Sequence, residues 1–163
     1  MPDPIVQSVA TYLDELGADY ELIDCDPDLA DTAAFCAHYG YPPERAANTI
    51  VVASRRPAGF HAACVVLATT RLDVNHKVRD LLGVRKLSFA LADVTKELTG
   101  MLIGGVTPFA LPETMPLFVD SRIMDLDWVI FGAGSRSAKI KTSPQVFTHL
   151  PQAKVVEDLG LDA

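Results

Sequence analysis

The sequence predicts a single α+β domain with a mixed, mostly antiparallel β-sheet flanked by helices. The chain has 163 residues, 49% of them apolar and 21% charged, which suits one globular domain with a substantial core. Short β-rich runs alternate with helical segments, and glycine or proline stands between most of them. No internal repeat or low-complexity segment breaks this pattern. We therefore expect one domain over residues 1–163.

Apolar spacing and capping residues predict the helices. Apolar side chains recur at helical spacing over residues 4–16, Asp3 and Pro4 suit the N-cap and first turn, and Gly17 can end the helix. This amphipathic helix should pack on the domain. Further helical segments are expected from Asp31 or Thr32 to Tyr39, for one or two turns at 42–45, over 75–83, from Asp93 to Leu98, and over 144–150 after a cap at Ser143.

Runs of β-branched and aromatic residues predict the strands. The two most apolar runs, 49–54 and 60–68, are separated by a hairpin signal at 55–59, so both should be central strands. The other expected strands cover 20–23, 86–89, 117–119, 128–131, 137–141 and 154–156.

Charge and composition exclude several classes of function. The formal charge is -7 and the pI is near 4.9, which argues against broad binding to DNA or other nucleic acid but leaves room for one small basic pocket. The first twenty residues are acidic and contain no basic residue, so no secretory or mitochondrial leader is expected. No apolar run is long enough to cross a membrane. We expect a cytoplasmic protein without membrane contact.

The cysteines and histidines do not form the patterns of a redox or metal site. The three cysteines have no C-x-x-C spacing and are odd in number, so we expect reduced core residues. The four histidines have no metal-like spacing, and we expect neither a metal nor a cofactor. The residues concerned are Cys25, Cys36, Cys64, His38, His61, His76 and His149.

Motifs of two other enzyme classes are incomplete. Gly132 and Gly134 follow a strand, as in a dinucleotide-binding turn, but Ser137 holds the third glycine position and the next residues look extended. No serine lies in a G-x-S-x-G elbow, so a serine hydrolase is not supported.

The segment from Thr99 to Phe109 carries the most informative pattern in the chain. A glycine pair is followed three residues later by Pro108, which predicts a loop whose backbone lies very close to a neighbouring group. Successive N–H groups of such a loop can bind an anion or a polarised carbonyl oxygen. The alternative is an ordinary connection between a helix that ends near Gly100 and a strand that begins near Leu117.

The order of motifs resembles the YbaK and prolyl-tRNA-synthetase-associated editing-domain family. The matching segments are TGMLIGGVTPFALP, MPLFVD, WVIFGAGS and the closing SPQVF, and the similarity runs from about residue 20 to the C-terminus. The most specific part is Gly104-x-x-x-Pro108. The resemblance implies an enzyme that acts in trans to hydrolyse the ester of mischarged tRNA, with small amino acids preferred. The implied partner is the aminoacyl-tRNA 3′ end, and the sequence leaves open whether the enzyme acts alone or beside an aminoacyl-tRNA synthetase.

The resemblance also implies roles for particular residues. The backbone at Gly104, Gly105 and Val106, in the loop closed by Pro108, would orient the acyl carbonyl and stabilise the tetrahedral oxyanion. A pocket lined by Phe35, Cys36 and His38 could select the amino-acid side chain. The full set of expected substrate-binding residues is Thr32, Phe35, Thr107, Lys77, Gly134 and Arg136.

One position departs from the family pattern. Family members usually carry a lysine that contacts the 3′-terminal phosphate, and this chain has Asn48 in that place. Asparagine can hydrogen-bond a phosphate oxygen but brings no charge. Three readings stay open: Lys77, Arg136 or Lys139 takes the role, the substrate differs, or the protein is a non-catalytic module that binds a tRNA end, a nucleotide or a synthetase. A hydrolase of small esters or thioesters is a further alternative.

Overall fold

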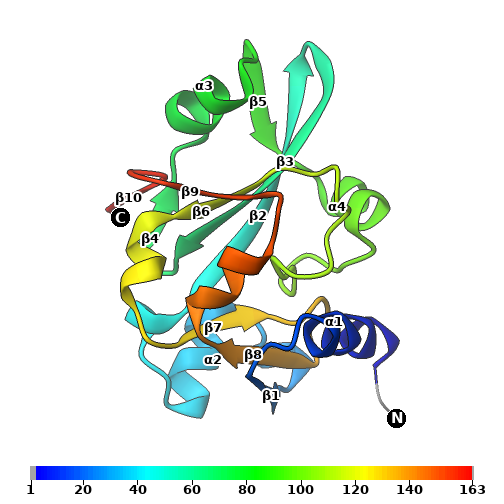
Figure 1. Cartoon of the computed structure of the whole chain (residues 1–163), viewed down its shortest axis with the longest axis vertical. Helices are drawn as coiled ribbons and strands as arrows, with labels where there is room; N and C mark the ends of the chain where they lie inside the picture. The colour runs from blue at the N-terminus through cyan, green and yellow to red at the C-terminus, as the bar shows by residue number, and fades with distance from the viewer. Residues whose placement is uncertain (1–2, 163) are drawn as a thin grey trace.

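The structure, a computed structural model, describes residues 3–162 as an α+β domain, which confirms the predicted class. One long hairpin connects its two ends, with α3 at one end and α2 at the other (Figure 1). The helices are α1 (Pro4–Glu15), α2 (Thr32–Tyr39), α3 (Arg79–Leu82) and α4 (Ala92–Thr99). The strands are β1 (Tyr20–Asp24), β2 (Ala47–Arg56), β3 (Ala58–Leu67), β4 (Thr70–Leu72), β5 (Lys86–Phe89), β6 (Leu117–Asp120), β7 (Val129–Gly132), β8 (Ala138–Thr142), β9 (Ala153–Val156) and β10 (Gly160–Asp162).

The main sheet has five strands in the order β5-β2-β3-β6-β9. The pairs β5/β2 and β2/β3 are antiparallel, whereas β3/β6 and β6/β9 are parallel, so the sheet is mixed as expected. Neighbouring residues of β3 enter different cores: Ala63 and Val65 face one cluster, and Cys64 and Val66 face the other. Burial on both faces explains why this strand reads as an unbroken apolar run.

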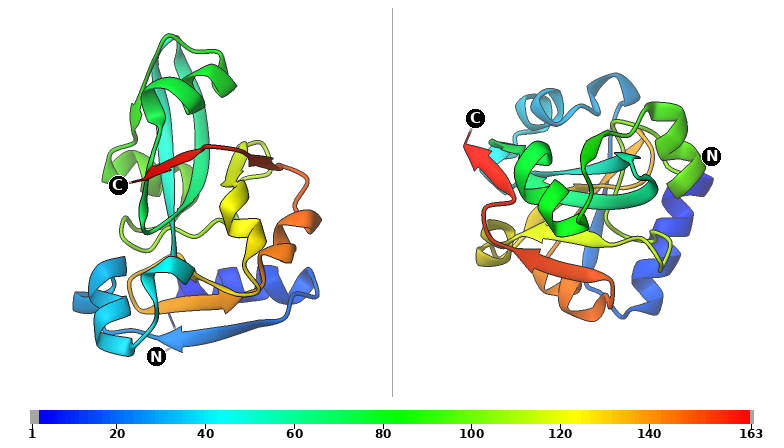
Figure 2. Two further views of the ribbon diagram at one scale, coloured as in Figure 1. Left: turned by 90° about the vertical axis from the view of Figure 1, so that its left-hand side faces the viewer. Right: turned by 90° about the horizontal axis from the view of Figure 1, so that it is seen from above.

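The expected single sheet is divided into three. β1, β8 and β7 form a separate antiparallel sheet, and β10 pairs with β4 in a two-stranded one. The sequence did not predict β4 or β10 because three residues are too few to show an alternating pattern. A single parallel bridge joins Ala46, just before β2, to Ile130 of β7. The three-stranded sheet β1-β8-β7 lies across one end of the main sheet (Figure 2).

Helix α1 confirms the predicted N-terminal amphipathic helix. It buries Val6, Val9 and Leu13, and Asp3 caps it by accepting a hydrogen bond from the Ile5 N–H at 2.9 Å. Gly17 follows the helix with a φ of 71°. The other carboxylate oxygen of Asp3 accepts hydrogen bonds from two serines of the turn before β8, so the helix is tied to that turn.

Several expected helices are shorter or differently wound. The segment 75–83 begins as a π-helical turn at Val74–Val78 and continues as α3, while Pro43–Arg45 and Pro144–His149 are 3-10 turns. Asp73 precedes the first of these without a capping hydrogen bond, but Ser143 caps the last as predicted. Such short segments cannot complete enough i→i+4 hydrogen bonds to settle as α-helices.

Several smaller features can be described over residues 3–162. The three cysteines are buried and unpaired, as predicted. No group of acidic, histidine and cysteine side chains in this range has the arrangement of a metal site. None of the helices described is both long enough and apolar enough to cross a bilayer. The residues after Gly134 form β8 rather than a helix, so the dinucleotide-binding turn is absent there.

Candidate functional site

A cavity of about 580 Å³ lies where the main sheet meets the three-stranded sheet β1-β8-β7. Its walls come from the start of α2, the first half of β2, the loop after α4, and the facing ends of β7 and β8. The lining residues are Asp31, Thr32, Ala33, Pro43, Ala47, Asn48, Thr49, Ile50, Val51, Ala68, Phe89, Ala90, Thr95, Ile103, Gly104, Val106, Gly132 and Lys139. Such a volume is in the range of small-molecule sites.

The glycine loop is held against the turn between β7 and β8. The Leu102 N–H donates to the Gly134 carbonyl at 2.9 Å, and the Gly134 N–H donates to the Gly105 carbonyl at 2.6 Å. A Cβ on Gly105 would stand 2.2 Å from the Ser135 carbonyl oxygen. The predicted close backbone approach is therefore confirmed, and the partner at Gly105 is the protein's own turn. Gly134 supports the loop and does not line the cavity.

Not every amide of the loop is free to bind a ligand. Of the three residues expected to bind the acyl oxygen, Gly105 has its N–H occupied within the loop, where it donates to the Leu102 carbonyl at 2.9 Å. The N–H groups of Gly104 and Val106 donate no hydrogen bond to residues 3–162, and both residues line the cavity. Two main-chain donors thus remain next to the hollow.

The rest of the loop supports these two amides. Thr107 is fully buried, and its hydroxyl accepts a 3.5 Å hydrogen bond from the Phe109 N–H. Pro108, which stands between Thr107 and Phe109 in the sequence, is also buried. Thr107 and Pro108 therefore shape the loop from behind, and neither lines the cavity.

Asn48 and Thr32 form one polar wall of the cavity. The Thr32 hydroxyl donates a hydrogen bond of 2.5 Å to Asn48 Oδ1. This contact occupies the acceptor end of the carboxamide and leaves its NH₂ group without a partner in the described chain. Position 48 thus presents a neutral donor to the cavity.

Lys139 presents the only ammonium group among the residues that line this cavity. It lies on β8 directly opposite Gly132 of β7, and it is 5% exposed. Its Nζ lies 5.7 Å from the centre of the Phe35 ring and forms no ion pair with a carboxylate of residues 3–162. Burial lowers the pKa of Lys139, and the nearby charge of Arg136 lowers it further.

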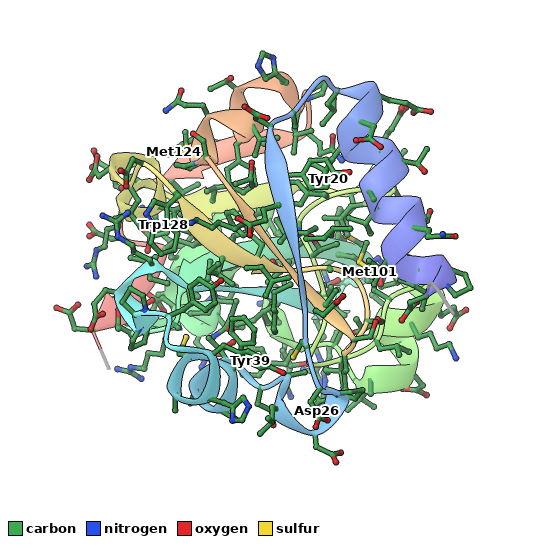
Figure 3. The ribbon with its side chains drawn as sticks, turned by 90° about the horizontal axis from the view of Figure 1, so that it is seen from below. Tyr20, Asp26, Tyr39, Met101, Met124 and Trp128 are labelled. Carbon is green, nitrogen blue, oxygen red and sulfur yellow. The ribbon has the colours of Figure 1, made fainter. Side chains whose placement is uncertain are left out.

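Phe35 and Arg136 lie near the cavity without lining it. Phe35 is fully buried behind the wall, with its ring stacked on Tyr41 at 5.5 Å and tilted against Tyr39 at 4.9 Å. Figure 3 looks onto this end of the molecule and labels Tyr39, the last residue of α2. Arg136 stands next to Gly104, donating to the Pro27 carbonyl at 3.0 Å and forming an ion pair with Asp31 at 3.1 Å.

Lys77 is not brought to the cavity. It belongs to the π-helical turn that leads into α3, and α3 lies at the opposite end of the molecule from α2 (Figure 1). Of the three cations that the sequence left open, only Lys139 lines the hollow. No local pattern distinguishes Lys139 from the other two, because its position depends on the pairing of β8 with β7.

The mouth of the cavity carries exposed apolar side chains that the sequence did not single out. Phe89 at the end of β5 is 58% exposed, and Ile103 in the glycine loop is 53% exposed. Both line the cavity. An exposed aromatic ring at a polar hollow is suited to stack on a flat ligand.

The comparisons with known proteins agree with the sequence resemblance. The chain is 24% identical over 157 residues to the uncharacterized protein YwhH of Bacillus subtilis, covering 96% of this chain and 98% of YwhH. Its fold is similar to a structure described as a proposed trans-editing enzyme for prolyl-tRNA synthetase, with a TM-score of 0.82 and 21% identity over 96% of this chain and 98% of that one. It is also similar to the hypothetical protein APE2540, with a TM-score of 0.83 and 27% identity over 94% and 99% of the two chains.

A family model assigns the greater part of the sequence. The model of the aminoacyl-tRNA editing domain matches residues 26–150, a range that contains α2, β2, the glycine loop and β8. These are the elements that build the cavity. The chain therefore belongs to the aminoacyl-tRNA editing domain family.

Proposed function

We propose that this protein hydrolyses the ester between a wrong amino acid and the terminal ribose of tRNA, acting in trans. The observation that carries this proposal is the pair of unpartnered N–H groups at Gly104 and Val106 beside the cavity. Family membership supports the same class of substrate.

The two amides would act on the acyl carbonyl. Water adds to the carbonyl carbon and gives up a proton, and the negative charge that develops on the carbonyl oxygen is stabilised by the N–H groups of Gly104 and Val106. The ester C–O bond then breaks, and the ribose oxygen leaves with a proton. Loss of one such donor costs other hydrolases about 3–4 kcal/mol, so two fixed amides can supply much of the catalysis. An aminoacyl ester is already activated toward hydrolysis, which lowers the rate enhancement that the protein must supply.

The mouth of the cavity suits the nucleoside end of this substrate. Phe89 can offer its exposed ring to the terminal adenine, and base–aromatic stacking contributes about 1–3 kcal/mol. The chain is acidic overall, so recognition of tRNA would depend on this local site rather than on a broad basic surface.

The test is deacylation of a panel of tRNAs charged with radiolabelled wrong amino acids. We expect amino-acid release above the spontaneous rate for at least one of them, with small amino acids preferred. An active family member serves as the control. If no member of the panel is hydrolysed while the control is active, the proposal fails. Turnover of free aminoacyl esters without tRNA would instead indicate a small-molecule esterase.

Asn48 supports a second candidate, a non-catalytic module that binds a tRNA end, a nucleotide or a synthetase. The family lysine is absent from this position. If Asn48→Lys creates deacylation that the natural protein lacks, the non-catalytic function is favoured. If Asn48→Ala abolishes an existing activity, the asparagine is part of a working enzyme.

A further inference from the structure

The buried ammonium group of Lys139 forms no ion pair within the part of the chain that the structure describes. Its side chain is 5% exposed, and no carboxylate of residues 3–162 lies within ion-pair distance. The carboxylate on the cavity wall, Asp31, is already paired with Arg136 at 3.1 Å. Burying an unpaired charge is costly, and such groups are retained where a ligand supplies the opposite charge.

The strand pairing brings Lys139 to the same cavity as Asn48. Ala46 of the segment before β2 bridges to Ile130 of β7, so Asn48 and Gly132 follow two residues later in these parallel segments. Gly132 in turn pairs with Lys139 across β7 and β8. Opposite residues of an antiparallel pair project to the same face, and Gly132 has no side chain to obstruct its neighbour. Lys139 is thus paired with Gly132, and both of them line the cavity together with Asn48.

The other polar groups at this wall are also donors. The Asn48 carboxamide has its Oδ1 occupied by Thr32, so its NH₂ group is the end left for a ligand. Thr32 and Ala33 begin helix α2, whose N-terminal end carries a partial positive charge and unpaired N–H groups. The Asn48 NH₂ group and the start of α2 are therefore donors at this wall. The groups near Lys139 that favour its charge are Asp31, which is already paired with Arg136, and the buried thiols of Cys25 and Cys36.

We propose that Lys139 and the Asn48 NH₂ group together form the receptor for an oxyanion on the bound substrate. This inference rests on the proposed binding of an aminoacyl-tRNA end in the cavity. The oxyanion has two sources in such a ligand: the phosphate 5′ to the terminal adenosine, or the carboxylate of an acidic amino-acid side chain. Lys139 is a binding residue in this assignment. From β8 it would contact the same anion that a lysine at position 48 would contact from β2.

The experiment is calorimetric binding of non-hydrolysable ligands to the intact protein. The first probe pair is 3′-(L-alanylamino)-3′-deoxyadenosine with and without a 5′-phosphate. The second pair, without phosphate, carries L-aspartyl or L-asparaginyl in place of L-alanyl. We expect removal of one of these anions to weaken binding to the natural protein about 10-fold or more, and we expect Lys139→Met to lose that difference. Lys139→Arg, which keeps the charge, should retain part of it.

The outcomes separate this inference from the proposed function. A phosphate-dependent difference or a carboxylate-dependent difference that disappears in Lys139→Met supports the receptor and identifies its ligand. If Lys139→Met discriminates within both pairs as strongly as the natural protein does, or if the natural protein discriminates within neither, the inference is overturned. The probes contain an amide in place of the ester and require no turnover. If the protein binds the probes in this way but deacylates no tRNA, the proposed deacylase activity is refuted while the proposed anion receptor is supported.

Discussion

Thr32 Oγ1 donates a hydrogen bond to Asn48 Oδ1 at 2.5 Å, which orients the Asn48 carboxamide with its NH₂ group toward the cavity. Thr32 opens α2 and Asn48 lies near the start of β2, so this contact connects the helix to the sheet at the site. A side chain that aligns another polar group contributes through orientation as well as through its own bond energy.

We expect Thr32→Val to weaken the site because the carboxamide loses its fixed orientation. The loss of one hydrogen bond corresponds to about 1 kcal/mol, or roughly 5-fold in kcat/KM for deacylation. Thr32→Ser is the matched control, since it keeps the hydroxyl. Equal activity in the valine and serine variants would show that the contact has no role in function.

We expect Gly104→Ala to reduce activity more than it reduces stability. Gly104 has a φ of +84°, and an added Cβ would stand 2.1 Å from Arg136 Nη1, so Arg136 or the loop must shift. Gly100→Ala is the control, because Gly100 has a φ of +74° with open space around it. Both variants carry the left-handed penalty of about 1 kcal/mol. A thermal melt with a deacylation assay checks the comparison; equal activity in the two variants contradicts it.

We expect Gly105→Ala to destabilise the fold itself. Its Cβ would meet the backbone of Ser135 at 2.2 Å, and a main chain cannot move aside as a side chain can. The loop would separate from the turn before β8 and lose the Gly134 hydrogen bonds. A decrease of about 2 kcal/mol or more in the free energy of unfolding, measured in urea, is the expected result. An unchanged urea midpoint would show that the turn adapts.

We expect Asp3→Ala to lower the free energy of unfolding by about 1 kcal/mol, because it removes the cap of α1 and the link to the turn. Hydrogen bonds from Ser135, and then from Ser137 and the Ile5 and Val6 amides, lower the pKa of Asp3 below 3.8. A carboxylate with a lowered pKa stabilises the fold above its unfolded pKa, and this stability is lost as the pH falls through the folded value.

The acid arm of the urea titration checks the Asp3 assignment. Between pH 5 and the acid limit, the natural protein should lose stability more steeply than Asp3→Asn does, since asparagine does not titrate. Parallel curves for the two proteins would mean that Asp3 contributes no pH-dependent stability.

We expect Lys139→Met to be at least as stable as the natural protein, because it removes a buried charge. Burial lowers the pKa of Lys139 below 10.5, with Arg136 acting in the same direction and Cys25, Asp31 and Cys36 opposing it. The unfolded chain then binds more protons in the window below pH 10.5. The stability of the natural protein should therefore rise with pH through that window, and that of Lys139→Met should not.

The binding of an anion at Lys139 should follow the opposite trend. The ammonium group loses its proton as the pH rises through the lowered pKa, so affinity for the anionic probe should fall at a pH below 10.5. Lys139→Arg should bind without this decrease, because arginine stays protonated. Calorimetric titrations from pH 7 to 10 measure the effect. A natural protein and an arginine variant with the same pH profile would contradict it.

The sequence by itself determined the elements whose signals are local. Capping residues and apolar spacing placed α1 from Pro4 to within one residue of its end, and glycines in the left-handed conformation end α2 and α4 at Gly40 and Gly100 as predicted. The buried hairpin of β2 and β3 followed from two unbroken apolar runs. The glycine pair before Pro108 also predicted correctly that the loop approaches another part of the molecule very closely.

Only the tertiary structure decided which groups meet at the site. The Gly105 N–H is hydrogen-bonded to the Leu102 carbonyl within the loop. Lys77 lies in the turn that leads into α3, at the other end of the molecule from α2. Lys139 reaches the cavity because β8 pairs with β7 in one register, and a shift of one residue would turn its side chain to the other face. Register and long-range hydrogen bonds depend on residues far apart in the chain, so no local pattern in the sequence could have fixed them.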